Sequence, residues 1–226
     1  MWKSVQKRDR IIWKSGNPYE AGTDKTFSLD TLPQEYTAYG NGDYRINGLE
    51  VEQADGSDTA NLKFESYKIT KGKYSLKGLP AMFAKEDEAE TLEIVLADRV
   101  SGLKAHLLYS VFPHLDVITR AVRLEQTGET PVTVKKAMSM EMDFEYREMD
   151  AVHFYGRHNV ERQMERTHLG HANWSVGSIR GTSSHHHNPF VILCDRNTEE
   201  TYGNCYGYAL AYSGNFTFET EVDQVG

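Results

Sequence analysis

The sequence predicts an all-β domain built from two stacked antiparallel sheets. Three observations support this prediction: short segments with a two-residue apolar period, turn signals between these segments, and no long helical period. A two-residue period places alternate side chains on opposite faces of a strand. One face is then buried and the other faces water, which is typical of an antiparallel sheet packed on a second sheet.

The start of the chain differs from the rest. Residues 1–25 contain the turn-rich stretches Gly16-Asn17-Pro18 and Ala21-Gly22-Thr23-Asp24 and no sustained apolar period, which predicts an N-terminal arm. Residues 26–226 are predicted to form one β domain, because sandwiches and barrels reach this length as a single unit. Turns are predicted at residues 55–57, 71–73, 127–129 and 213–215, each of which contains a glycine.

The predicted strands follow from apolar alternation. They cover residues 92–96, 103–111, 132–146, 190–194, 206–212 and 216–225. The longest alternation runs through residues 132–146, where Met138, Met140 and Met142 share one face. Glu141 and Asp143 lie on the other face, which this pattern predicts to be exposed to water.

Composition and charge exclude several classes of protein. The formal net charge is −8, which repels a polyanion such as nucleic acid. No apolar run approaches the roughly 18 residues that a membrane-spanning helix needs. The basic N-terminal segment is not followed by a long apolar stretch, so we expect no secretory signal and a cytoplasmic location. Cys194 and Cys205 either bridge two adjacent strands or stay free and buried, and a reducing compartment favours free thiols.

Three consecutive histidines, His185, His186 and His187, raise the question of a metal site. In an extended segment only His185 and His187 share a face. Zinc usually takes three or four protein ligands, and no cysteine or carboxylate lies at a helpful spacing nearby. The sequence therefore favours a hydrogen-bonded loop, and we expect neither a metal nor a cofactor.

The carboxylates Glu141, Asp143 and Glu145 form a second candidate site. Glycosidases use paired carboxylates, and alternate residues on one strand lie roughly 6–7 Å apart at the backbone. Catalytic carboxylates, however, normally come from different elements and face each other across the substrate. A solvated strand face is therefore the favoured interpretation, and a small hydrolase that uses Glu141 and Asp143 is the least favoured function.

Several sequence strings, in the same order along the chain, carry a family resemblance. They are Phe27-Ser28-Leu29-Asp30-Thr31-Leu32-Pro33-Gln34-Glu35-Tyr36, Tyr39-Gly40-Asn41-Gly42-Asp43-Tyr44-Arg45, Gly78-Leu79-Pro80-Ala81, Arg180-Gly181-Thr182-Ser183-Ser184-His185, Asn188-Pro189-Phe190 and Tyr212-Ser213-Gly214-Asn215-Phe216. Together with shorter matches up to residue 224, these strings span about residues 16–226. Over that range the chain resembles the N-terminal domain of bacterial family 36 α-galactosidases.

The resemblance implies a fold and a parent activity. It implies an antiparallel β-supersandwich of the galactose-mutarotase-like type, followed in the family by a (β/α)₈ barrel and a C-terminal β domain. The barrel carries both catalytic aspartates and releases terminal α-galactose from melibiose or raffinose with retention. Such a barrel takes about 200–250 residues, and none remain after Gly226. We therefore expect no catalytic residue in this chain and no activity of the chain alone.

The resemblance also implies three substrate-binding candidates. Family members form homo-oligomers in which N-domain loops approach a neighbouring subunit's pocket. In the family, this domain contributes an aspartate, and Asp9 is the matching residue here. The family's second contribution is an aromatic residue, often tryptophan, and Arg157 or His158 stands in its place here. The alternative is that all three are surface or domain-interface residues.

Two functions remain open from the sequence. The first is a non-catalytic domain that supports barrel packing, oligomerisation and the substrate entrance of an α-galactosidase. The second is a free-standing carbohydrate-binding module, in which Trp174, Tyr202, Tyr206 and Tyr212 stack on sugar. Core packing is the simpler role for most of these aromatic residues.

Overall fold

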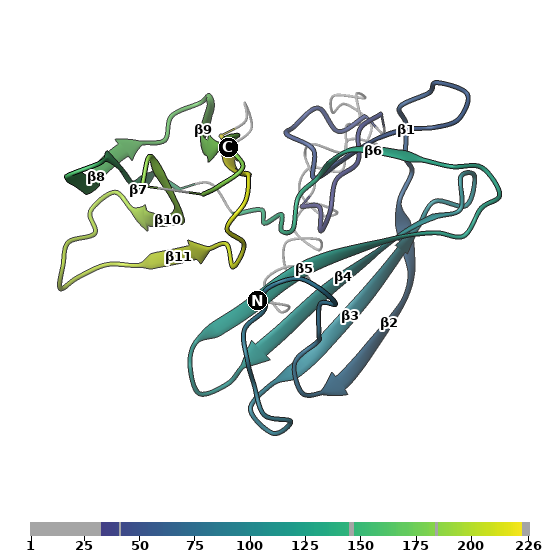
Figure 1. The fold of residues 1–226 in the computed structure, drawn as a ribbon, viewed down its shortest axis with the longest axis horizontal. Helices are drawn as coiled ribbons and strands as arrows, with labels where there is room; N and C mark the ends of the chain where they lie inside the picture. Colours follow the sequence, from purple (N-terminus) through teal and green to yellow (C-terminus); the bar gives the residue numbers. More distant parts are fainter. Residues whose placement is uncertain (1–32, 41, 145–146, 184, 223–226) are drawn as a thin grey trace, which may run out of the picture.

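The structure is a computed structural model that describes residues 33–40, 42–144, 147–183 and 185–222. These residues form twelve strands, β1 to β12, joined by turns and irregular segments, and they contain no helix (Figure 1). Within the described ranges there is accordingly no helix able to cross a membrane. The all-β prediction is confirmed. The predicted arm, residues 1–25, lies outside the described residues.

The first large sheet has four antiparallel strands in the order β2-β3-β4-β5. Its strands are β2 (Lys63–Lys71), β3 (Glu90–Ala97), β4 (Leu103–Phe112) and β5 (Val117–Gln126). The strands predicted at residues 92–96 and 103–111 lie in β3 and β4. The register places Ile94 opposite Leu107 and Leu96 opposite Ala105, so the predicted apolar faces combine into one buried surface.

The second large sheet has the order β11-β10-β7-β8 and is also antiparallel. Its strands are β7 (Met149–Arg157), β8 (Val160–His168), β10 (His187–Asp195) and β11 (Cys205–Ala209). The strand predicted at residues 190–194 lies within β10. β11 ends at Ala209, three residues before the end predicted from the alternation of residues 206–212.

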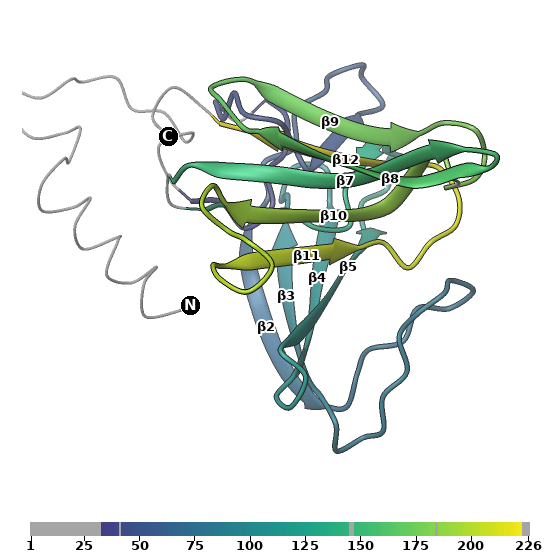
Figure 2. The same cartoon turned by 90° about the vertical axis from the view of Figure 1, so that its left-hand side faces the viewer.

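Two small antiparallel sheets complete the described fold. They pair β1 (Leu49–Glu52) with β6 (Thr133–Ala137) and β12 (Phe216–Glu221) with β9 (Asn173–Ser178). In Figure 2, β7, β9, β10, β11 and β12 run across the direction of β2 to β5. The strands of the second half therefore cross the direction of the first large sheet, and residues of both halves line one cavity.

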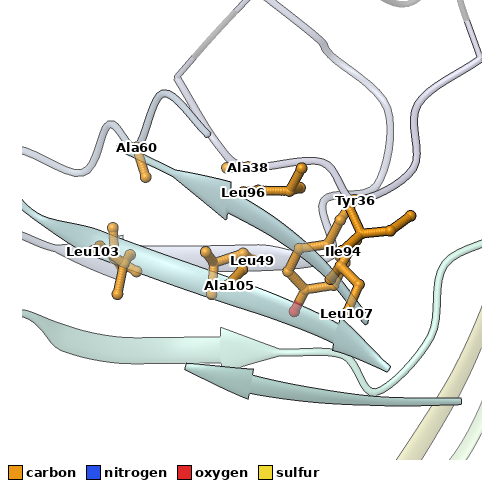
Figure 3. Close-up of a cluster of buried hydrophobic side chains, with 10 residues drawn as sticks. Tyr36, Ala38, Leu49, Ala60, Ile94, Leu96, Leu103, Ala105 and Leu107 are labelled. Atoms are coloured by element: carbon orange, nitrogen blue, oxygen red, sulfur yellow. The ribbon is translucent and has the colours of Figure 1, made fainter. Parts of the chain in front are cut away.

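Each half of the molecule has its own hydrophobic core. The first core lies where the inner face of the first large sheet meets β1 and the segment before it (Figure 3). Its buried side chains are Tyr36, Ala38, Leu49, Val51, Ala60, Ile94, Leu96, Leu103, Ala105 and Leu107. The second core joins β7 and β10 to β9 through Met149, Ala151, Val176, Val191 and Leu193. Apart from Tyr36, Ala38 and Ala60, which lie outside the strands, these buried side chains come from strands, mostly from alternate positions, which is why a two-residue period was visible in the sequence.

The predicted turns contain glycines for two different reasons. Gly56 and Gly72 have φ angles of 83° and 80°, in the left-handed region that favours glycine. Gly128 is needed instead for space, because a Cβ atom there would lie 2.2 Å from the carbonyl oxygen of Ser101. The chain after β5 can therefore pack tightly against the turn between β3 and β4.

The prediction of one long strand over residues 132–146 is wrong. Only Thr133–Ala137 forms a strand, and residues 138–144 continue without ladder pairing. The side chains of this irregular segment form hydrogen bonds with distant parts of the chain, which replace the regular ladder. The strand predicted at residues 216–225 is observed over Phe216–Glu221, and residues 223–226 lie outside the described residues.

Candidate functional site

A cavity of about 1160 Å³ lies between the two halves of the molecule. Its walls come from β5, the irregular segment 138–144, β10 and β12, together with residues 45–48. Beside the cavity is a polar junction, which we call the seam, and its residues Arg45, Arg120, Glu141 and Asp143 line the cavity. The seam consists of Glu35, Thr37, Asp43, Arg45, Tyr109, Arg120, Glu141 and Asp143.

Glu141 connects two segments of the seam that are distant in sequence. Its Oε2 atom accepts hydrogen bonds from the backbone N–H of Thr37 at 2.8 Å and from the Thr37 hydroxyl at 3.0 Å. Burial raises the pKa of Glu141 to about 7, and the negative charge of Asp143 adds to this effect, while the two Thr37 hydrogen bonds oppose it. This carboxyl group therefore exchanges its proton near neutral pH.

Asp143 takes part in the same junction through Arg45. The Asp143 Oδ2 atom accepts from the backbone N–H of Gln34 at 2.8 Å and lies 3.2 Å from Nη1 of Arg45. The Arg45 guanidinium also contacts Asp43 through two hydrogen bonds, at 3.0 Å and 2.8 Å. Only 3% of the Asp43 side chain is exposed, so Arg45 neutralises a charge that water does not reach.

Arg120 of β5 connects the first large sheet to the rest of the seam. Its Nη1 atom donates to the carbonyl oxygen of Glu141 at 3.0 Å, and its guanidinium lies 4.0 Å from the centre of the Tyr109 ring. The Tyr109 hydroxyl in turn donates to Glu35. β4 and β5 are thereby connected to both chain segments that meet at the seam.

These contacts correct the interpretation of the carboxylate row. Glu141 and Asp143 do not lie on a solvated strand face, because a backbone N–H group contacts one oxygen of each carboxylate and Arg45 pairs with Asp143. Their observed contacts, with Thr37, Gln34 and Arg45, are structural. Glu145 lies outside the described residues. Sequence reasoning missed Thr37, Arg45 and Arg120; the only signal was that Asp43 and Arg45 belong to one of the resemblance strings.

The substrate-binding candidates are not brought to the seam. Arg157 ends β7, His158 follows in the turn to β8, and both side chains are exposed. Asn159 in this turn has a φ of 64°, and its N–H donates to Glu161 at 2.9 Å. The hairpin thus presents Arg157 and His158 to solvent side by side. Asp9 lies outside the described residues.

The histidine-rich segment joins β9 to β10. The N–H of Gly181 donates to the Asn215 side chain at 2.6 Å, and the N–H of Ser183 donates to the Ser213 carbonyl at 2.9 Å. His187 is the first residue of β10, whereas the rings of His185 and His186 lie 4.5 Å apart before it. No group of three or more potential metal ligands is found among the described residues.

Cys194 and Cys205 are directly opposite each other on β10 and β11, and both are free thiols. The prediction of free thiols is confirmed, but only Cys194 is buried. The Cys194 thiol donates to the carbonyl oxygen of Asp150 at 3.7 Å. Burial raises the pKa of Cys194, which keeps this thiol protonated.

The proposed sugar-stacking aromatic residues divide into two groups. Trp174 packs edge-on against His153 at 5.6 Å and against Phe218 at 6.3 Å, within the second core. Tyr202, Tyr206 and Tyr212 are exposed, at 73%, 37% and 47%. Tyr206 also lies edge-on to Phe144 at 5.3 Å, so its ring already has an aromatic neighbour within the domain.

The fold and these sites define a β-sandwich domain whose polar centre is structural. The chain belongs to the glycosyl hydrolase family 36 N-terminal domain family, whose model matches residues 5–226. It is 53% identical over 210 residues to the bifunctional α-galactosidase/sucrose kinase AgaSK of Mediterraneibacter gnavus, covering 93% of this chain and 22% of that protein. It is 43% identical over 225 residues to the α-galactosidase AgaA of Geobacillus stearothermophilus, covering 99% of this chain and 30% of that protein.

Solved structures show the same likeness. The crystal structure of the family 36 α-galactosidase AgaB from Geobacillus stearothermophilus superposes with a TM-score of 0.87 at 43% identity, over 95% of this chain and 30% of that chain. The galactosidase domain of AgaSK superposes with a TM-score of 0.86 at 53% identity, over 93% of this chain and 29% of that chain. Variants of AgaA were solved in complex with raffinose and with stachyose. The chain therefore spans about 22–30% of the length of these relatives.

Proposed function

We propose that this domain acts within an α-galactosidase that hydrolyses terminal α-galactosides such as raffinose and melibiose with retention. Its role is to support the catalytic barrel, to take part in homo-oligomer assembly and to shape the substrate entrance. The observation that carries the proposal is the 53% identity, over 93% of this chain, to a protein named as an α-galactosidase/sucrose kinase. The raffinose and stachyose complexes of AgaA variants support the substrate class.

An uncovered part of the inner sheet face supports the packing role. In the register, Phe64, Tyr67 and Ile69 of β2 lie opposite core-facing residues of β3. They therefore extend the apolar inner face, yet they are 63%, 66% and 63% exposed. Apolar surface of this kind is favoured to be covered by another part of the same enzyme.

A second apolar surface supports the same role. The loop between β2 and β3 exposes Leu79, Met82 and Phe83, the last at 99%. Leu115 in the turn between β4 and β5 is exposed at 63%. Both connections leave the same end of the first large sheet (Figure 1), so this end offers apolar contacts to a neighbouring domain.

The test is a domain exchange in the AgaSK galactosidase domain. The purified 226-residue chain, the exchanged enzyme and the enzyme without an N-terminal domain are assayed with p-nitrophenyl α-galactoside and raffinose. We expect no hydrolysis by the chain alone, activity of the exchanged enzyme, and loss of activity or of assembly without the domain. Sedimentation of the exchanged enzyme checks the oligomer.

The same experiment distinguishes the other two functions. Hydrolysis by the chain alone that survives repurification and is lost in Glu141→Gln or Asp143→Asn would place an active site in the sandwich. Saturable binding of raffinose to the chain alone by calorimetry, together with an inactive exchanged enzyme, would establish a carbohydrate-binding module instead.

A further inference from the structure

Cys194 and Cys205 occupy positions in the second large sheet that suit a disulfide. Cys194 of β10 lies directly opposite Cys205 of β11 in the antiparallel ladder. Both are free thiols in the structure, with Cys194 buried and Cys205 exposed. The pair is separate from the seam, and neither cysteine lines the large cavity.

The hydrogen bonds around the two cysteines identify the type of pair they form. The N–H of Asp195 donates to the carbonyl oxygen of Asn204 at 3.2 Å, so the residues next to the cysteines are a hydrogen-bonded pair. Further along the ladder, the N–H of Leu210 donates to the carbonyl oxygen of Pro189 at 3.0 Å. Because bonded and non-bonded pairs alternate along an antiparallel ladder, both bonds make the cysteines a non-hydrogen-bonded pair.

This type of pair brings two side chains close together on one face of the sheet. Its Cα atoms are about 4.5 Å apart, which lies within the range of about 4.4–6.8 Å found in disulfides. The side chains are also closer than in a hydrogen-bonded pair. The two sulfur atoms can therefore join through side-chain rotation, while the strands stay paired.

Arg166 of β8 brings a positive charge to the same face. Its Nε atom donates to Asp150 at 2.6 Å, and this hydrogen bond is the main cause of its raised pKa. The charges of Cys194 and Cys205 in their thiolate forms add to that effect. The guanidinium therefore acts on both sulfurs, and a neighbouring cation favours the thiolate, which is the reactive form in disulfide exchange.

We propose that Cys194 and Cys205 are a modification site that forms a reversible disulfide by exchange with a small-molecule disulfide of the glutathione class. The Cys205 thiol loses its proton to water, and its thiolate attacks one sulfur of the small disulfide. A mixed disulfide forms on Cys205 and one small thiolate leaves.

The second step is intramolecular. Cys194 loses its proton and attacks the Cys205 sulfur, the bond between the two cysteines forms, and the second small thiolate leaves. The two small thiolates take up the two protons that the cysteines released. The protein thiols are thereby oxidised by two electrons, and the small disulfide is reduced by two electrons to two thiols.

Exposure determines the order of these steps. Cys205 is open to a dissolved reagent, whereas Cys194 is 2% exposed and its thiol donates to the carbonyl oxygen of Asp150 at 3.7 Å. Cys194 is therefore suited to the second step, in which the sulfur that it attacks is already on the neighbouring strand. The same exposure lets a small thiol reverse the reaction by attack on the Cys205 sulfur.

The disulfide has a mechanical consequence for one edge of the sheet. β11 is an edge strand of this sheet, paired only with β10 among the described residues. Its residues 207–209 line the large cavity. A covalent link to β10 restrains this part of the cavity wall, and it also stabilises the fold by restricting the unfolded chain.

The test uses the reduced 226-residue chain and glutathione disulfide, without denaturant. We expect the intact mass to fall by two hydrogen atoms and both cysteines to resist iodoacetamide. The melting temperature should rise by about a few degrees, and dithiothreitol should reverse all three changes. The chain has two cysteines, so peptide mapping of the non-reduced protein assigns the link.

Two matched variants separate the steps. Cys194→Ser should stop at the mixed disulfide and gain the mass of one bound glutathione, because the second attacking sulfur is missing. Cys205→Ser should stay unmodified over the same time, because the remaining thiol is buried.

The measurement on the unmodified chain decides the proposal even if a variant does not fold. A mixed disulfide that persists on Cys205, a disulfide between two chains, or no reaction at all would overturn it.

Discussion

Glu141 accepts two hydrogen bonds from Thr37, one from its backbone N–H at 2.8 Å and one from its hydroxyl at 3.0 Å. The two residues are 104 positions apart in the sequence. This contact joins the segment before β1 to the segment after β6. Both segments line the space between the two halves of the molecule, so the charge state of Glu141 affects how firmly they are held together.

The first prediction concerns pH. The pKa of Glu141 rises from 4.5 in the unfolded chain to about 7 in the folded state, so between these values the folded state binds the proton more strongly. The stabilising contribution of Glu141 is therefore full below pH 4.5 and is lost as the pH rises through 7, by up to about 3 kcal/mol. Urea unfolding measures the free energy of unfolding at pH 5 and at pH 8. Relative to the wild type, Glu141→Gln should be more stable at pH 8 than it is at pH 5.

Glu148→Gln is the control for this measurement, because the Glu148 side chain is 59% exposed. In Glu148→Gln, the difference in the free energy of unfolding between pH 5 and pH 8 should be the same as in the wild type. An equal effect of both substitutions would show that overall charge, and not the burial of Glu141, determines the pH dependence.

The second prediction concerns the Arg45 contacts. Arg45→Met removes the partner of Asp43, whose side chain is only 3% exposed, and we expect the free energy of unfolding to fall by about 3 kcal/mol. Lys104→Met is the matched control, since Lys104 pairs with Glu65, whose side chain is 44% exposed. That pair should contribute less than about 1 kcal/mol. Similar losses in the two variants would argue against a buried ion pair in the seam.

The third prediction concerns the first core. Leu107 is 0% exposed at the centre of β4, and Leu107→Ala should destabilise the domain by about 2–5 kcal/mol through the lost burial and the cavity left behind. Val100→Ala, at a side chain 96% exposed, should change stability by less than about 0.5 kcal/mol. Denaturant unfolding of both variants makes the comparison, and a small effect at Leu107 would contradict the described core.

The fourth prediction concerns the thiols. Native protein treated with iodoacetamide should be alkylated quickly at Cys205 and only slowly at Cys194, which is buried and has a raised pKa. After unfolding both thiols should react, and peptide mass spectrometry locates the labels. Equal rates in the native protein would mean that Cys194 is accessible, and no reaction at either position would indicate a disulfide.

The fifth prediction concerns the β7–β8 hairpin. Because Arg157 and His158 are exposed, replacing both with alanine should change the stability of the domain by less than about 0.5 kcal/mol. In the exchanged enzyme the same change should raise KM for raffinose with little effect on kcat, as expected for lost substrate contacts. Lys77→Ala, in an exposed loop elsewhere, is the control. Unchanged KM would exclude the hairpin from the substrate entrance.

Local patterns in the sequence were sufficient to locate much of the fold. Leu92, Ile94 and Leu96 alternate within β3, and the same kind of alternation runs through β4. Such alternation is a property of a few consecutive residues, so no knowledge of the partner strand was needed. The turn at Gly72 was predictable for the same reason, because its backbone conformation favours glycine.

The seam was not predictable in this way. The alternation of residues 138–144 resembles that of a strand, and it predicted exposed carboxylates at Glu141 and Asp143. In the structure Asp143 contacts Arg45, 98 residues away, and the segment is irregular. Nothing within a few residues of Asp143 indicates whether its carboxylate meets water or a guanidinium.

The sequence by itself determined the all-β class, the positions of the strands with regular alternation and, through its strings, the family. Only the tertiary structure decided that Glu141 and Asp143 join two segments, and that Cys205 is exposed while Cys194 is buried. The physical reason is that strand formation depends largely on neighbouring residues. Burial, pKa and hydrogen-bond partners depend instead on groups that folding brings together from distant parts of the chain.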